Sequence, residues 1–511
     1  MAKNAAVITH IFWIEEIILG QLQQKTTSGL FWSFLDSFGS QVIRFGFGIA
    51  IARALSPTDY GIMGMIVIFI SLGNLLTESG FGMALIQKKD ATEADYSTVF
   101  WFNLFVAIII YMFLFISAGK IADFYNQPLL IDVIRIVAFS IVLNALGIIH
   151  YTILNKKIEF KKQAYVRLGA VIPTGIIGVV LAYNGFAVWA LVIQSLASGV
   201  ITTFGIWFVH KWRPQFTFSI ASFKELYKYG SKVFISGLLD VLFSKIYFPL
   251  IGKYFPVAQL GYYVKAEGFY RLIVRQVAIA YGRVTFPAFS SIQNEPERFL
   301  KNYLKIYRLL AFILFPLTFI SIASSPSLIQ VLLTDKWLPI VPFMKVFFIE
   351  GYFFSLYMLN INVFYAKGRS NIPLKIEIFK KALLILSVFI AFKYGIEALI
   401  WGQLISSFIV FIISTIIIRN LIDVQISYLA GQITPIISII ILSAVFNLVV
   451  FDYSYSTATP VTTLLMKIVT LPTLYIALSL IFNRQIIGEF ADLFRGLIPS
   501  HIERGNKRKE L

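Results

Sequence analysis

The sequence has no cysteine and few charged residues. Aspartate, glutamate, lysine and arginine together make up 14% of its 511 residues, whereas a typical soluble domain contains about 25%. A chain of this length that folded in water would form two or more domains with polar surfaces, and it lacks the residues to cover them. Since 58% of the sequence is hydrophobic, the composition predicts an integral membrane protein that lies almost wholly in the bilayer.

Motifs of enzymes and of metal sites are absent as well. The sequence contains neither a P-loop nor a dinucleotide-binding fingerprint, so we expect no ATPase of its own, no cofactor and no catalytic residues. Without cysteine there is no disulfide and no thiolate metal site, and we expect no bound metal. The net charge of +18 would suggest nucleic acid in a soluble protein. Here the basic residues lie between apolar runs, which favours anionic lipid headgroups over nucleic acid.

Fourteen apolar runs are long enough to cross the membrane, because a transmembrane helix needs about 20 residues. The expected spans are 28–55, 60–87, 97–119, 129–154, 164–183, 186–209, 230–252, 258–289, 303–324, 339–365, 373–391, 394–418, 427–450 and 461–482. The eighth carries several charges and fits the pattern least well. Residues 1–27 contain no signal-peptide pattern, and we interpret them as a weakly amphipathic lead-in.

Basic residues concentrate in every second loop between these spans. Examples are the groups at Lys88–Lys89, 156–167, 211–228, 298–308 and 367–381, whereas the alternate loops contain few lysines or arginines. By the positive-inside rule, this alternation places both termini in the cytoplasm. The basic residues of the C-terminal tail agree with this orientation, and they are Arg504, Lys507, Arg508 and Lys509.

An internal repeat relates the first span to the seventh. The motif Leu35-Asp36-x-x-x-Ser40 recurs as Leu239-Asp240-x-x-x-Ser244, and each copy is followed by a short loop with a proline and then a glycine. Six spans separate the copies, so both have the same orientation, which implies two lobes around a cavity. The expected segments are the lead-in 1–27, the first lobe 28–210, a linker 211–229, the second lobe 230–420, two added helices 421–484 and a basic tail 485–511.

Charged residues within the spans are expected to mark the functional site. Ionisable groups at mid-membrane cost on the order of 3 kcal/mol and usually face a cavity. They fall on the leading helices of each repeat, at helical spacing with serines and asparagine. The basic candidates are Arg44, Lys245, Lys265, Arg271, Arg275 and Arg283. The acidic candidates are Asp36, Glu78, Asp240 and Glu267.

The excess of basic over acidic candidates indicates an anionic ligand. Arginine binds phosphate or pyrophosphate bidentately, and the acidic residues could bind H⁺ or Na⁺ or orient the arginines. Structural roles remain open for single residues: Glu267 and Arg271 have the i, i+4 spacing of an ion pair, and Asp36 and Arg44 could neutralise each other. Glu350 could be a proton site or lie near a helix end. His150 and His210, near span ends, are interpreted as incidental.

Three segments carry a resemblance to a known family. They are the opening SGLFWSFLDSFGS at 28–40, ARALSPTDYG at 52–61 and TESGFG at 77–82. The sequence resembles the oligosaccharide flippases, the polysaccharide transporters of the multidrug/oligosaccharidyl-lipid/polysaccharide exporter superfamily. The subgroup that it resembles contains exporters of the colanic-acid and teichuronic-acid type. The resemblance covers the chain from about residue 27 to the end of the last span.

The resemblance implies an all-α membrane protein of the MATE-like fold, with two six-helix lobes and two C-terminal helices. It also implies that an undecaprenyl-pyrophosphate-linked oligosaccharide crosses the bacterial inner membrane by alternating access, for O-antigen, capsule or exopolysaccharide synthesis. In that case Arg44, Arg271 and Arg275 would hold the pyrophosphate or anionic sugars. Asp36, Glu78 and Asp240 would couple transport to H⁺ or Na⁺, or orient the arginines. A polysaccharide polymerase complex is a further expected partner.

Three other functions fit parts of the sequence. An ion-coupled multidrug exporter of the same superfamily would bind cationic drugs, against which the basic excess argues. A membrane glycosyltransferase or ligase would need a sizeable external catalytic loop, and every expected outside loop is short. A non-transporting membrane component of a polysaccharide assembly complex would tolerate loss of the intramembrane arginines.

Overall fold

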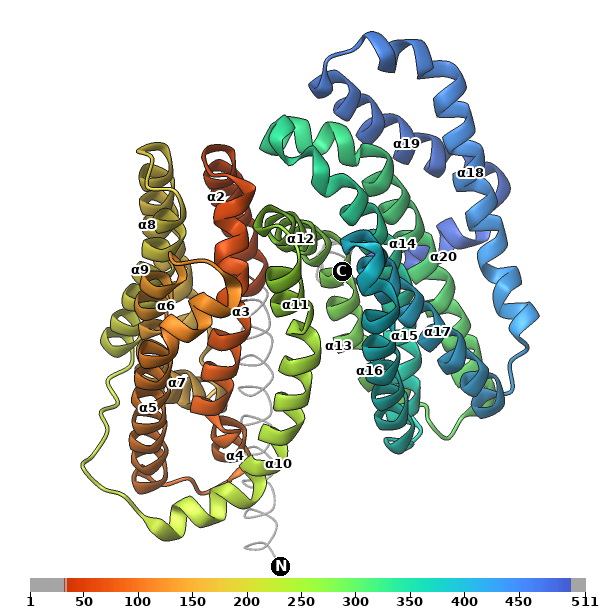
Figure 1. Cartoon of the computed structure of the whole chain (residues 1–511). Helices are drawn as coiled ribbons and strands as arrows, with labels where there is room; N and C mark the ends of the chain where they lie inside the picture. Colours follow the sequence, from red (N-terminus) through yellow and green to blue (C-terminus); the bar gives the residue numbers. More distant parts are fainter. Residues whose placement is uncertain (1–31, 33–34, 498–511) are drawn as a thin grey trace, which may run out of the picture. The chain divides into compact units, whose positions relative to one another are not determined.

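The computed structural model describes residue 32 and residues 35–497. The predicted lead-in 1–27 and the end of the predicted tail, with its four basic residues, lie outside the described residues, as does the side chain of Arg283. Throughout the described part the chain forms helices and loops with no strand, as Figure 1 shows. The prediction of an all-α protein is therefore confirmed.

The contacts divide the chain into two compact units, Met1–Gly261 and Tyr262–Leu511. The first contains a π-helical turn and the helices up to the start of α12. These are η1 (Leu35–Gly39), α2 (Ser40–Ala54), α3 (Pro57–Glu78), α4 (Phe81–Gln87), α5 (Glu93–Tyr125), α6 (Leu130–Val137), α7 (Phe139–Lys156), α8 (Phe160–Tyr183), α9 (Val188–Val209), α10 (Ile220–Lys245), α11 (Tyr247–Tyr254) and α12 (Val257–Tyr270).

The second unit begins at Tyr262, within α12. Its elements are η2 (Arg271–Arg275), α13 (Gln276–Ser291), α14 (Pro296–Leu333), η3 (Asp335–Ile340), α15 (Val341–Ala366), α16 (Asn371–Ala391), η4 (Phe392–Tyr394), α17 (Ile396–Ile422), α18 (Ile426–Thr457), α19 (Pro460–Phe482) and α20 (Arg484–Leu497). The predicted boundaries of the two lobes and the linker at 211–229 stay a prediction.

Eleven helical segments of the described chain are long and apolar enough to cross a membrane. They include Pro57–Gln87, which joins α3 and α4, and Leu130–Lys156, which joins α6 and α7. The other three predicted spans are also helical: η1 and α2 form the first, α12 to α13 the eighth, and α16 the eleventh. The chain is thus a multi-pass membrane protein, and the total of fourteen spans stays a prediction.

Side-chain caps set several helix starts. Ser56 and Asp59 form a reciprocal capping box at the start of α3, and Thr92 and Asp95 form another at the start of α5. Each box satisfies backbone N–H groups that have no partner within the helix. At the end of α3, Ser79 and Gly80 adopt left-handed backbone conformations, which interrupt the helix between α3 and α4.

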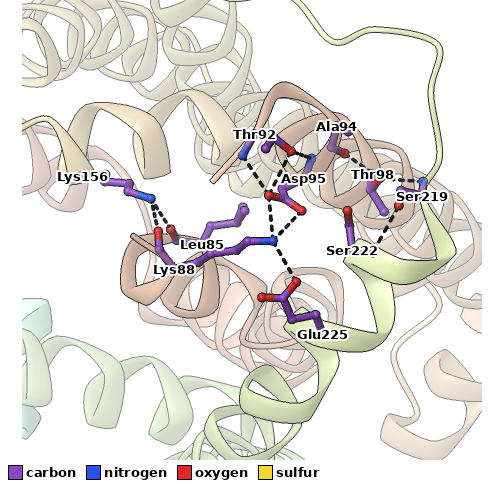
Figure 2. Close-up of polar contacts among 10 residues, drawn as sticks. All are labelled: Leu85, Lys88, Thr92, Ala94, Asp95, Thr98, Lys156, Ser219, Ser222 and Glu225. Carbon is purple, nitrogen blue, oxygen red and sulfur yellow. Dashed lines mark hydrogen bonds and ion pairs between the residues drawn. The ribbon is translucent and has the colours of Figure 1, made fainter. Parts of the chain in front are cut away.

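Hydrogen bonds and ion pairs hold the start of α10 against α5 and the end of α4 (Figure 2). Lys88 pairs with Asp95 of α5 at 3.0 Å and with Glu225 of α10 at 2.9 Å. The backbone N–H of Ser219 donates to Thr98 Oγ1 at 2.9 Å. Burial opposes the ammonium form of Lys88, but the bonds to Glu225 and Asp95 outweigh it and raise the pKa of Lys88. The start of α10 is therefore held against the start of α5.

Side chains of α19 donate to two backbone carbonyls of α14, one of which is left free by a proline. A proline lacks the N–H that would bond the carbonyl four residues earlier, so Pro316 leaves the carbonyl of Phe312 without its helical partner. The hydroxyl of Tyr475, from α19, donates to that oxygen at 3.1 Å. Lys467, also from α19, donates to the carbonyl of Ala323 at 3.1 Å. Helix α19 is thus hydrogen-bonded to the α14 backbone at two levels.

Two glycines of the repeat bring backbones into contact. A methyl group on Gly61 of α3 would overlap the carbonyl oxygen of Val257, at the start of α12. A methyl group on Gly261 would overlap the carbonyl oxygen of Pro57, at the start of α3. Gly61 lies four residues after Pro57, which Gly261 contacts, and Gly261 lies four residues after Val257, which Gly61 contacts. The two contacts are therefore reciprocal. The proline–glycine spacing seen in the sequence therefore serves a close crossing of α3 with the first turn of α12.

Candidate functional site

Asp36 is buried in the π-helical turn η1, with 6% of its surface exposed. Its Oδ2 accepts a hydrogen bond from Nη1 of Arg167, in α8, at 3.0 Å. The other carboxylate oxygen, Oδ1, has no hydrogen-bond partner within the described structure. Ion pairs removed from water gain from mutual attraction but lose hydration, so this carboxylate depends on Arg167 and has one oxygen available for a further donor.

Arg44 lies on α2 beside this pair and interacts electrostatically with both Asp36 and Arg167. Its side chain is exposed, and among the described residues no hydrogen-bond acceptor is assigned to it. The closest contact of Asp36 is with Arg167, and Arg44 adds an attraction to the same carboxylate. The mutual neutralisation of Asp36 and Arg44 stays a prediction. The guanidinium of Arg167 also lies over the ring of Tyr151, 5.0 Å from its centroid. Two arginines thus share one carboxylate.

The sequence predicted that Arg167 belongs to the basic loop at 156–167. The structure places it in α8, seven residues after the first residue of that helix. Its position inside the expected fifth span was the signal that could have marked it as an intramembrane charge.

Glu78 ends α3, and its carboxylate lies over Gly82. A methyl group placed on Gly82 would approach Glu78 Oε1 at 3.0 Å and Thr152 Oγ1 at 3.4 Å. One turn earlier on α3, Asn74 accepts a hydrogen bond from Asn144 of α7 at 3.0 Å. The polar stripe expected on this helix therefore faces α7 at both levels.

The second copy of the repeated aspartate has a different environment. Asp240 is exposed on α10, whereas Asp36 is buried. Lys245, at the end of α10, lies over the ring of Phe248, 4.8 Å from its centroid. The two aspartates therefore share a sequence position but not a local environment.

In the second unit, Arg271 and Arg275 bound the π-helical turn η2. Arg271 pairs with Glu267 of α12 at 2.8 Å, as the i, i+4 spacing suggested. Arg275 is exposed, and its guanidinium lies 5.7 Å from the ring centroid of Phe354. Lys265 lies over the fully buried Trp337, at 5.8 Å. These contacts are of the cation–π type that holds a cation on an aromatic face.

Glu350 of α15 lies near the same turn. Its Oε1 accepts a hydrogen bond from the hydroxyl of Ser407, of α17, at 2.8 Å. The phenol of Tyr270 lies beside the same carboxylate. Glu350 therefore contacts two hydroxyl groups, those of Ser407 and Tyr270.

Both π-helical turns of the described chain carry predicted site residues. Turns of this type are rare and occur frequently at functional sites, because the extra residue reorients side chains. Asp36 lies within η1, and Arg271 and Arg275 bound η2. The first turn is adjacent to Arg44 and Arg167, so each unit presents arginines next to a carboxylate at an irregular helical turn.

His150 and His210 contact each other near the ends of α7 and α9. Their Nδ1 atoms lie 3.1 Å apart, and the side chain of His150 is completely buried. Trp207 and Trp212 pack on the imidazole of His150, with ring centroids at 4.9 and 5.2 Å. Burial, assisted by the charges of Lys157 and Lys162, lowers the pKa of His210.

Comparison with known proteins identifies the family. The chain belongs to the family described as polysaccharide biosynthesis protein, which matches residues 50–342. It is 26% identical over 445 residues to the teichuronic acid biosynthesis protein TuaB of Bacillus subtilis, covering 85% of this chain and 90% of that protein. It is 24% identical over 375 residues to the lipopolysaccharide biosynthesis protein WzxC of Escherichia coli, covering 72% and 75%. The resemblance inferred from the sequence motifs is confirmed.

Solved structures establish the fold. The chain superposes on the lipid II flippase MurJ, in an inward closed conformation, with a TM-score of 0.70 and 18% identity, over 90% of this chain and 100% of that one. It superposes on an inward-facing multidrug resistance transporter of the MATE family with a TM-score of 0.59 and 14% identity, over 76% and 96%. The expected MATE-like fold is therefore confirmed.

Proposed function

We propose that this protein moves an oligosaccharide linked to undecaprenyl pyrophosphate from the cytoplasmic to the outer leaflet of the bacterial inner membrane. Transport would proceed by alternating access, with both termini in the cytoplasm, and would supply a surface polysaccharide pathway and its polymerase. The protein would act as a transporter and not as an enzyme. The family and the fold support the class of function, since both are shared with proteins of polysaccharide biosynthesis and with flippases.

The observation that carries the proposal is the placing of arginines at the two π-helical turns. Arg44 and Arg275 have exposed side chains within helices of a membrane protein, where a charge costs on the order of 3 kcal/mol. Arg167 and Arg271 each pair with one carboxylate. Guanidinium groups match the oxygens of pyrophosphate bidentately. An anionic headgroup would compensate the unpaired positive charge.

The acidic residues are proposed to couple the cycle to H⁺ or Na⁺, or to orient the arginines. Asp36 and Glu267 each hold an arginine, which favours orientation for these two. Glu78 and Asp240 have no ion-pair partner among the described residues, which favours ion binding. A ligand drives a conformational change only through its different affinities for the two states.

The test is replacement of Arg271 and Arg275 by alanine, followed by measurement of surface polysaccharide. We expect polysaccharide to fall at least tenfold while the protein remains stably inserted. Arg298→Ala is the matched control, because Arg298 is exposed outside the expected spans and pairs only locally with Glu295 at 3.1 Å. Normal polysaccharide in the double variant would refute the transport role of these arginines and favour a non-transporting component. Export of cationic drugs by the wild type would favour the multidrug exporter.

A further inference from the structure

An apolar groove of about 340 Å³ lies between α7 and α9 in the first unit, apart from the residues proposed for transport. Its lining includes Leu143 and Leu146 of α7, Phe204 and Phe208 of α9, and Arg213, which follows α9. Phe204 and Phe208 are 59% and 82% exposed. The groove therefore opens at the surface of the two helices, and it combines apolar walls with one charged residue.

Arg213 is held in place by the backbone around it. Its Nη1 donates to the carbonyls of His210 and Trp212, at 3.1 and 2.7 Å, and its Nη2 donates to the carbonyl of Trp207 at 3.0 Å. The guanidinium also lies over the ring of Trp207, 5.1 Å from its centroid. An arginine has five N–H donors, and these bonds use three of them. The exposed guanidinium is therefore fixed in orientation and has two donors without an assigned acceptor among the described residues.

The arginine and the groove follow each other in the order of a lipid headgroup and its chain. The segment Val188–Val209 is long and apolar enough to cross a membrane, so its end at Val209 lies near one membrane surface. Arg213 comes four residues later, in the non-helical segment before α10. The groove runs the other way, back along α9 as far as Thr203, which is roughly 9 Å deeper than Val209 at 1.5 Å per residue. A phospholipid of that leaflet would have its phosphate at the level of Arg213 and its chain along the groove.

The charges near this end of the groove favour an anionic lipid. The basic residues there are Lys157, Lys162, Lys211 and Arg213, of which Lys211 adjoins His210 in the chain and the other three act on the charge of His210. The acidic residues are Glu159, which pairs with Lys162, and Glu93, which accepts a hydrogen bond from the indole of Trp212. Positive charge is therefore in excess. Phosphatidylglycerol has a net negative charge, whereas phosphatidylethanolamine has an ammonium group that these residues would repel.

We propose that the groove between α7 and α9 binds an anionic phospholipid of the surrounding bilayer, such as phosphatidylglycerol. The phosphate accepts hydrogen bonds from the free donors of Arg213, with the ammonium of Lys211 nearby, since charge-assisted bonds to phosphate are among the strongest that arginine forms. The first part of one acyl chain lies between Leu146 and Phe204. The site goes beyond the proposed function, because its ligand belongs to the bilayer and is not transported.

A second hollow in the same unit shows how this groove differs from ordinary lipid-facing surface. It has a volume of about 460 Å³, lies between α2 and α8, and is lined only by apolar residues and glycine, among them Ile43, Gly46 and Val180. A surface of that kind can contact any acyl chain and has no group that distinguishes one headgroup from another. The groove between α7 and α9 has in addition a fixed guanidinium at its end. We therefore expect headgroup selectivity at that groove and none at the hollow.

The experiment titrates the delipidated full-length protein with phosphatidylglycerol or phosphatidylethanolamine and measures the first bound lipid by native mass spectrometry. We expect the wild type to bind phosphatidylglycerol at least fivefold more tightly than phosphatidylethanolamine. Leu146→Trp fills the groove and should weaken binding of phosphatidylglycerol at least fivefold. Gly46→Trp is the matched control, because it fills the hollow between α2 and α8, where no atom lies within 4 Å of the side-chain position of Gly46. Its affinity should stay within twofold of the wild type.

Two further variants test the charges at the end of the groove. Arg213→Gln should reduce the preference for phosphatidylglycerol over phosphatidylethanolamine to within twofold. Because this variant also loses bonds to three backbone carbonyls, Lys211→Gln, at an exposed residue, provides a change that leaves those bonds intact, and it should lower the preference about twofold. Equal affinity of the wild type for the two lipids would overturn the proposal. Unchanged binding of phosphatidylglycerol in both Leu146→Trp and Lys211→Gln would also overturn it, whether or not Arg213→Gln folds.

Discussion

The carboxylate of Asp36 and the guanidinium of Arg167 form an ion pair at 3.0 Å between η1 and α8. The two residues are separated by 131 positions in the chain. Asp36 is buried, whereas 40% of the Arg167 side chain is exposed. The pair therefore fixes the first helix against α8 while leaving part of the arginine accessible to a ligand.

Replacing Asp36 by asparagine should destabilise the protein by about 1–3 kcal/mol, because Arg167 would lose its partner while partly removed from water. The double variant Asp36→Asn with Arg167→Gln should regain most of that stability, because neither charge would remain unpaired. It should not regain transport, since the diphosphate would lose one arginine. Thermal unfolding in detergent and a polysaccharide assay measure the two effects. Recovery of polysaccharide in the stable double variant would show that the pair is purely structural.

The helices and the repeat could be predicted because both depend on local sequence. Apolar runs identified the helical segments, and the repeated proline–glycine spacing marked Gly61 and Gly261, although the close crossing at these glycines was not predicted. The pair of Glu267 and Arg271 followed from the i, i+4 spacing alone. In each case the interacting residues lie on one helix or at corresponding positions of two repeats.

The partner of Asp36 could not be predicted, because it depends on tertiary packing. A regular helix of 3.6 residues per turn placed Asp36 and Arg44 on one stripe, but the π-helical turn at Leu35–Gly39 alters that register. The different environments of Asp36 and Asp240 have the same origin. A repeated sequence position does not specify which neighbouring helix covers it.

Alanine at Gly61 or at Gly261 should lower stability by about 1–3 kcal/mol, the usual cost of overpacking. The added methyl group would overlap a backbone carbonyl oxygen, and backbone cannot move aside as a flexible side chain can. Gly119→Ala is the control, because its side-chain position is open. The thermal unfolding temperature of each variant provides the measurement. Equal temperatures for Gly61→Ala and Gly119→Ala would show that α3 and the start of α12 are not in contact.

Replacing Tyr475 by phenylalanine should lower the free energy of unfolding by about 1 kcal/mol, because the hydrogen bond to the carbonyl of Phe312 is lost. The cost should depend on Pro316, because alanine there restores the N–H that this carbonyl would otherwise bond. Tyr475→Phe should therefore have little effect in a Pro316→Ala background. A double-mutant cycle of unfolding free energies tests this dependence. Additive effects would mean that the hydroxyl does not compensate for the proline.

The buried pair of His150 and His210 should make stability depend on pH. Burial, with the nearby charges of Lys157 and Lys162, lowers the pKa of His210 in the folded protein, whereas the unfolded value is about 6.5. Below that pH the unfolded chain binds the proton more readily, so stability present above about pH 6.5 is lost as pH falls toward the folded pKa. We expect the unfolding temperature to fall between pH 7.5 and pH 5. His210→Gln should flatten this dependence, and an equally steep profile in that variant would assign it to other groups.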